Sequence, residues 1–190
     1  MKVGIGILAA LIIAIILGGC WYIEQRNSLI KFDEDVKGAL ANIDAQLQRR
    51  NELIPNLVST VKGYAAHEEK LFTGIAEARG KLAGAKTLSE KAEADAVLSA
   101  EVGHLLAIAE NYPELKANEN FIRLQDEITG TENRITVART RYNESVKIYN
   151  MRIRQFPGSS FAKELGLDPR DYFEPPKGRE AVIEAPKVEF

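Results

Sequence analysis

The chain has 190 residues, of which 45% are apolar and 27% are charged, and its formal net charge is −2. This composition is typical of a folded protein, and the near-neutral charge excludes broad electrostatic attraction to nucleic acid. The single cysteine excludes an internal disulfide framework.

The first predicted element is an apolar run over residues 3–23, VGIGILAALIIAIILGGCWYI, which has no charged side chain. At about 1.5 Å per residue, a helix of this length spans a hydrocarbon core about 30 Å thick. Trp21 and Tyr22 end the run, where amphipathic rings favour the membrane interface. The run therefore predicts a single transmembrane anchor.

The only cysteine, Cys20, leaves an alternative open. LGGC at residues 17–20 resembles a bacterial lipobox, in which the signal is cleaved and the cysteine is acylated. In that case the remaining chain faces outward. A polar tether usually follows an acylated cysteine, whereas Trp21 and Tyr22 follow here, so an uncleaved span is favoured. Within such a span Cys20 is an inert small apolar residue.

The basic residues flanking the run predict its orientation. Lys2 precedes it, and Arg26, Lys31 and Lys37 follow. Because lysine and arginine accumulate on the inner side, the C-terminal domain is expected in the cytoplasm and the short N-terminus outside.

After the anchor, apolar residues recur every three or four positions from Leu29 to Leu82. This period predicts one long helix. Pro55 lies off the apolar stripe, so it predicts a kink and not an end. Gly80 and Gly84 mark the end, and at about 1.5 Å per residue the helix would be roughly 80 Å long.

Two further long helices are predicted. An alanine-rich helix runs from Ser89 to about Asn111 and stops before Pro113. Asn118 can cap a third helix, whose apolar stripe is expected to continue to Phe156. Because no segment alternates with period two, no strand is predicted.

These elements predict an all-α fold: a transmembrane helix, then an elongated antiparallel bundle of three long helices and a short C-terminal helix. The expected domains are the anchor (1–25), the bundle (26–157) and a tail (158–190), whose helix near residues 161–165 docks on the bundle. The first helix is longer than its neighbours. An apolar stripe left uncovered on it would need a partner.

Catalytic constellations are not recognisable in the sequence. His67 and Glu68 could contribute to a metal site, but a metal needs three or four converging ligands, and only one histidine is local to that position. No pair of carboxylates stands out as acid and base. We therefore expect no cofactor and a protein that is not an enzyme; a metal-dependent hydrolase that uses His67 is the remote alternative.

Two stretches have more distinctive polar residues than helix packing alone requires. They are QRR followed by LIPNL (48–57), and NYPELKANEN (111–120). The structural interpretation is an arginine of the first helix paired with a carboxylate of the third, and a capped turn between helices. The functional interpretation is a surface for docking a partner. The candidate residues are Arg49, Arg50, Pro55, Asn56, Tyr64, His67, Glu68, Tyr112, Pro113, Glu114, Asn118 and Asn120.

These stretches resemble a known family. QLQRRNELIPNLVSTVKGYAAHE (46–68) and NYPELKANENFIRLQDEITGTENRI (111–135) are similar to two signature stretches of the bacterial LemA family, and YNESVKIYNMRIRQFP (142–157) and PKVEF (186–190) resemble its later pattern. The resemblance covers nearly the whole chain from Asn27. Family members often have Tyr-Asn where this chain has Arg26-Asn27, and lipoprotein-like members place the cysteine beside it, which further disfavours lipidation here.

The resemblance implies an N-terminal membrane helix, a short outside N-terminus and a helical bundle, and it does not supply an enzyme activity. A related magnetosome-membrane protein implies work in membrane organisation. We therefore expect a single-pass protein of the bacterial inner membrane that acts as a scaffold or binding protein. Its expected partners are the bilayer and either further copies of itself or another membrane protein, with no nucleic acid and no small-molecule substrate.

Overall fold

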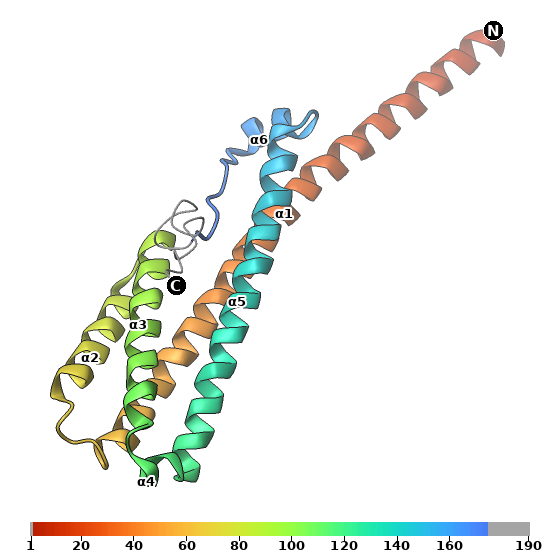
Figure 1. Cartoon of the computed structure of the whole chain (residues 1–190). Coiled ribbons are helices and arrows are strands. Elements are labelled where there is room, and N and C mark those ends of the chain that lie inside the picture. Colours follow the sequence, from red (N-terminus) through yellow and green to blue (C-terminus); the bar gives the residue numbers. More distant parts are fainter. Residues whose placement is uncertain (1, 175–190) are drawn as a thin grey trace, which may run out of the picture. The chain divides into compact units, whose positions relative to one another are not determined.

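The computed structural model describes the backbone of residues 2–174 and the side chains of residues 6–8 and 10–174. Helices are the only regular elements in this part of the chain (Figure 1). The prediction of an all-α fold is confirmed. The helices are α1 (Lys2–Lys62), α2 (Glu69–Gly84), α3 (Leu88–Ala109), α4 (Pro113–Lys116), α5 (Glu119–Arg154) and α6 (Gly158–Leu165).

The chain divides into two compact units, and α1 and α5 each contribute to both. Over the described residues, unit 1 contains residues 2–40 and 141–171, and unit 2 contains residues 41–140 and 172–174. The closing stretch PKVEF lies outside the described residues.

Helix α1 joins the apolar run to the folded part of the chain without a break. Its large apolar side chains from Ile7 to Ile23 are exposed, and burial begins at Leu29, which is 4% exposed. Pro55 lies inside the helix, which continues beyond it, as predicted. The apolar run and the first helix of the folded part are therefore one continuous helix.

The expectation that the first helix extends to Leu82 is wrong. Helix α1 ends at Lys62, and the chain turns through residues 63–68 before α2 begins. The apolar stripe is weakest here, because its two positions in the turn are Tyr64 and Glu68, neither of which is buried. Gly63 adds a residue of low helix propensity, and together these features allow the chain to fold back.

Helices α2 and α3 form a hairpin in unit 2 (Figure 1). Thr87 caps α3 in a capping box with Glu90. The apolar stripe that was expected to be uncovered is in fact buried on both sides of the turn, so the argument that it needs a partner no longer holds. The buried residues are Ile43, Leu47, Ile54, Leu57 and Val61 on α1 and Leu71, Phe72, Ile75, Ala78 and Leu82 on α2.

Helix α5 follows its predicted boundaries closely. The side chain of Asn118 accepts hydrogen bonds from the backbone N–H groups of Asn120 and Phe121, so the predicted cap is present. The prediction that Phe156 belongs to the apolar stripe is wrong, because this side chain is 85% exposed. The helix ends at Arg154, so helical periodicity no longer applies to Phe156.

The predicted short helix of the tail is α6, and its Phe161 is 6% exposed. Its start requires a glycine, since a Cβ on Gly158 would lie 2.2 Å from the carbonyl oxygen of Arg152. Its end is a left-handed cap at Gly166, with φ of 64°. Two glycines therefore fix how the chain turns at both ends of α6.

Candidate functional site

The two signature stretches meet at one end of unit 2, where α1 ends and α5 begins (Figure 1). The amide nitrogen of Asn118 donates a hydrogen bond of 3.1 Å to the hydroxyl of Tyr64. This bond joins the α1–α2 turn (63–68) to the connection that contains α4. We call these two segments, residues 63–68 and 110–120, the end face.

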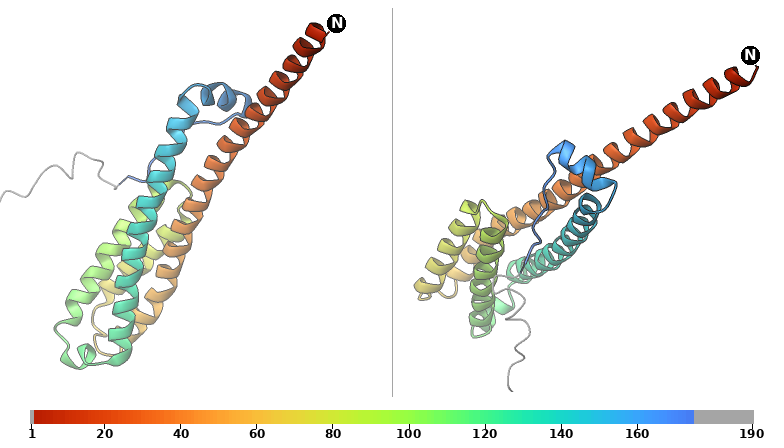
Figure 2. Two further views of the ribbon diagram at one scale, coloured as in Figure 1. Left: turned by 90° about the vertical axis from the view of Figure 1, so that its right-hand side faces the viewer. Right: turned by 90° about the horizontal axis from the view of Figure 1, so that it is seen from above.

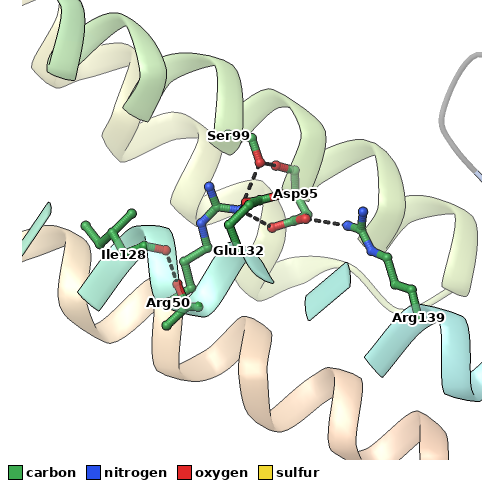
Figure 3. Close-up of polar contacts among 7 residues, drawn as sticks. Arg50, Asp95, Ser99, Ile128, Glu132 and Arg139 are labelled. Carbon is green, nitrogen blue, oxygen red and sulfur yellow. Dashed lines mark hydrogen bonds and ion pairs between the residues drawn. The ribbon is translucent and has the colours of Figure 1, made fainter. Parts of the chain in front are cut away.

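A buried ion-pair cluster also joins the stretches (Figure 3). Arg50 is 3% exposed. Its Nη1 lies 3.0 Å from an oxygen of Asp95 on α3 and 2.6 Å from an oxygen of Glu132 on α5. It also donates a 2.8 Å hydrogen bond to the hydroxyl of Ser99. The predicted pairing of an α1 arginine with a carboxylate of the third long helix is therefore confirmed.

Asp95 is the centre of the cluster. It is 1% exposed, and its second oxygen pairs with Arg139 of α5 at 2.5 Å. Burial raises the pKa of this carboxyl, and the two arginines act in the opposite direction. Two guanidinium groups thus offset part of the cost of burying one carboxylate, and ion pairs connect α1, α3 and α5.

Sequence reasoning missed Asp95, although a signal was present. The residue occupies a buried stripe of α3 whose members recur every three or four positions: Ala92, Asp95, Leu98, Val102, Leu105 and Ala109. An acid on a buried stripe is the natural partner of an arginine on another. Arg139 follows the stripe residue Ala138 and had no such signal.

The other signature residues divide into structural and surface groups. Pro113 starts α4, and the backbone oxygen of Tyr112 accepts a bond from Lys116. The backbone oxygen of Glu68 accepts one from Phe72, and Pro55 is partly buried. The surface group consists of the exposed side chains of Arg49, Asn56, His67, Glu114 and Asn120.

The metal-site alternative receives no support from the described side chains. His67 is exposed. Over the described part of the chain, no group of three or more His, Cys, Asp or Glu side chains is placed to hold a metal ion.

The residues predicted at the membrane interface contact α6 in unit 1. The ring of Phe161 lies 6.3 Å from that of Trp21 and 5.0 Å from that of Tyr22, both edge-on. The hydroxyl of Tyr22 donates to the carboxylate of Glu164 at 2.7 Å. Cys20, which directly precedes Trp21, is exposed and its thiol is free.

An extended strap after α6, residues 167–171, is bound to α5 by polar side chains that sequence reasoning did not identify. Tyr142 and Tyr149 donate hydrogen bonds of 2.9 Å to the backbone oxygens of Asp171 and Asp168. Asn150 exchanges two bonds with the backbone of Arg170. Burial raises the pKa of both tyrosines, so their hydroxyls remain donors at neutral pH.

Asp33 of α1 also binds the strap. Its carboxylate accepts a 2.9 Å hydrogen bond from Arg170 and pairs with Lys37 at 2.9 Å. Burial raises the pKa of Asp33, but the bonds from Lys37 and Arg170 outweigh burial, so the pKa lies below its ordinary value. The strap thus links α1 and α5 within unit 1.

Comparison with known proteins places this arrangement in a family. Residues 39–190 match the model of the LemA family. The chain belongs to the LemA family. The match contains both signature stretches, the ion-pair cluster and the strap.

Curated relatives of this LemA-family chain include magnetosome proteins. MamQ 2 of Paramagnetospirillum magneticum is 25% identical over 189 residues, covering 84% of this chain and 68% of the relative. MamQ of Magnetospirillum gryphiswaldense is 26% identical, with the same coverage. Protein LemA of Metamycoplasma hominis is 24% identical over 147 residues, covering 77% of this chain and 67% of its own length.

The described residues contain one helix long and apolar enough to cross a membrane, and none of its apolar window is buried inside the protein. This helix and the family relatives fit a membrane-associated helical protein.

Proposed function

We propose that this LemA-family protein is a non-enzymatic, single-pass membrane protein that presents a helical domain for binding other proteins at the membrane. The observation that carries the proposal is the apolar part of α1, which is exposed from Ile7 to Ile23 and is continuous with a helix that is buried from Leu29 onward. Such a surface is stable only in lipid or against another protein. Relatives named as magnetosome proteins support a role in membrane organisation.

The domain lies in the cytoplasm under this proposal, because Arg26, Lys31 and Lys37 follow the span and only Lys2 precedes it. The test is labelling of a single cysteine with a membrane-impermeant maleimide in intact cells. A variant with Cys20→Ser and Lys147→Cys should be labelled only after lysis. Labelling in intact cells would contradict the orientation.

The partner is a protein that docks on the end face, or a second copy of the chain. The support is the set of signature side chains that the fold leaves exposed on the end face, among them His67, Glu114 and Asn120. The Arg50 cluster and the helix caps explain the buried polar residues of the signature stretches. They do not explain the exposed ones, for which docking of a partner is the proposed role.

Site-specific photocrosslinking in the native host tests this docking proposal. A photoreactive residue at His67 or Glu114 should give a discrete adduct, and the adduct's mass separates self-association from a second protein. Glu77 and Lys81, exposed on α2 outside the signature stretches, are matched controls. Equal labelling at His67 and at the controls would contradict docking at the end face.

Acylation at Cys20 is the alternative function, with the domain in the envelope. The exposed, free thiol is the observation that keeps this alternative open. The two interpretations predict different masses for the mature protein.

A further inference from the structure

The turn between α5 and α6 carries an apolar side chain with no cover. Phe156 is 85% exposed, which is more than any other large apolar side chain that the structure describes, those of the apolar run included. It lies between the end of α5 at Arg154 and the start of α6 at Gly158. A phenylalanine in this position is unfavourable in water and favourable in a less polar phase.

The turn lies close to the end of the apolar run. Helix α6 lies across the end of α5 and against α1 (Figure 2). Its Phe161 contacts the rings of Trp21 and Tyr22, which directly precede Ile23, the last residue of the exposed apolar run of α1. Phe156 is five residues from Phe161 in the sequence, so it is held near the level at which a bilayer surrounding the run would end.

The side chains around the turn carry a net positive charge, which is attracted to an anionic phospholipid surface. From residue 145 to residue 165 there are four basic residues and one acidic residue, Glu164. Arg152, Arg154 and Lys163 of this set are exposed. Exposed basic residues beside an exposed aromatic residue are the combination by which protein segments bind anionic lipid interfaces.

We propose that the α5–α6 turn is a second membrane contact, which inserts Phe156 into the interface of the bilayer that holds α1 and places Arg154 and Lys163 against anionic headgroups. This inference rests on the proposed membrane anchoring and adds to it. A bilayer is the fitting occupant because the turn is tied, through α6, to the last residues of the apolar run. The contact would fix α5 as well as α1 at the membrane surface.

Tryptophan quenching by brominated lipids tests the contact in the full-length protein, which has one native tryptophan. In vesicles of phosphatidylcholine brominated in the upper acyl chain, the wild type reports the depth of Trp21. The variant Trp21→Phe/Phe156→Trp reports the turn. The matched control is Trp21→Phe/Glu144→Trp, which places the probe on the exposed surface of α5, roughly 15 Å before its end.

We expect quenching at position 156 to approach that of Trp21 and to exceed that at position 144 roughly twofold or more. Strong quenching of Trp21 with equally weak quenching at 156 and 144 would overturn the inference and leave the anchor intact. Absence of quenching at Trp21 would overturn the anchor itself, and the contact with it.

A second measurement tests the headgroup contact. Adding phosphatidylglycerol to the vesicles should increase quenching at position 156, and Arg154→Gln with Lys163→Gln should remove that increase. The same response to phosphatidylglycerol with and without these two substitutions would overturn the role of the basic residues.

Discussion

At the scale of single residues, Arg50 is the side chain on which unit 2 depends most. It is buried and pairs with both Asp95 and Glu132. Arg139 still pairs with Asp95 when Arg50 is removed, so the cost should be below the about 3–5 kcal/mol of a fully unpaired buried charge, at about 1–3 kcal/mol. We therefore predict that Arg50→Met lowers the free energy of unfolding by about this amount, measured by denaturant unfolding of the detergent-solubilised protein.

The control for this prediction is the neighbouring position. Arg49 is exposed. We expect Arg49→Met to change the free energy of unfolding by about 0.5 kcal/mol or less. Equal effects of the two substitutions would show that the cluster contributes nothing beyond the helix itself.

Gly158 gives a second residue-scale prediction. Its Cβ position lies 2.2 Å from the carbonyl oxygen of Arg152, so Gly158→Ala forces the backbone apart. Overpacking of this kind costs about 1–3 kcal/mol. Gly38, in the interior of α1 with no atom near its Cβ position, is the matched control. Gly38→Ala should stabilise the protein by about 0.5–1 kcal/mol in the same unfolding assay; a similar gain at position 158 would contradict the structure.

At the scale of elements, the stability that the strap contributes should depend on pH, because its contact with α1 includes the carboxylate of Asp33. Its folded pKa is depressed, so its stabilising contribution is complete above the ordinary aspartate pKa of about 4 and is lost as pH falls toward the folded pKa. We predict that the melting temperature of the wild type falls more steeply below about pH 4 than that of Asp33→Asn.

The control for the pH prediction is Asp35→Asn, which changes an exposed carboxylate on the same helix. This variant should retain the acid dependence of the wild type. If Asp33→Asn retained it as well, the contact between Asp33 and Arg170 would not stabilise the strap.

The elements that sequence reasoning predicted well are those with local signals. Helix α3 ends before Pro113, as predicted, Asn118 caps α5, and the three-and-four period located the buried faces. The turn after Lys62 was missed because the apolar period has the same phase in α1 and α2, so the stripe hides the break. The strap was missed for a different reason. Three α5 side chains bind its backbone carbonyls, and a carbonyl has no signature in the sequence.

The candidate site was predictable in part. An arginine on an otherwise apolar stripe indicated a buried partner, and Glu132 is one. The sequence did not reveal that Asp95 and Arg139 extend the pair into a cluster, because that depends on how α3 packs against both α1 and α5. Similarly, the exposure of Phe156 follows from the helix end at Arg154, which the apolar period alone does not mark.

At the scale of the whole molecule, the proposed function depends on whether the apolar run stays on the mature chain. If the run stays on the chain, α1 is an anchor continuous with both folded units, and Trp21, Tyr22 and α6 lie at a membrane interface. If the chain is cleaved before Cys20, most of the exposed apolar surface is lost and acyl chains replace it. The domain would then lie outside the cell membrane.

The most direct test is the intact mass of the protein extracted from membranes of its native host. For an uncleaved anchor we predict a mass that includes the residues before Cys20 and no acyl group on its thiol. A mass that begins at Cys20 and includes added acyl chains would contradict the uncleaved anchor and the cytoplasmic domain.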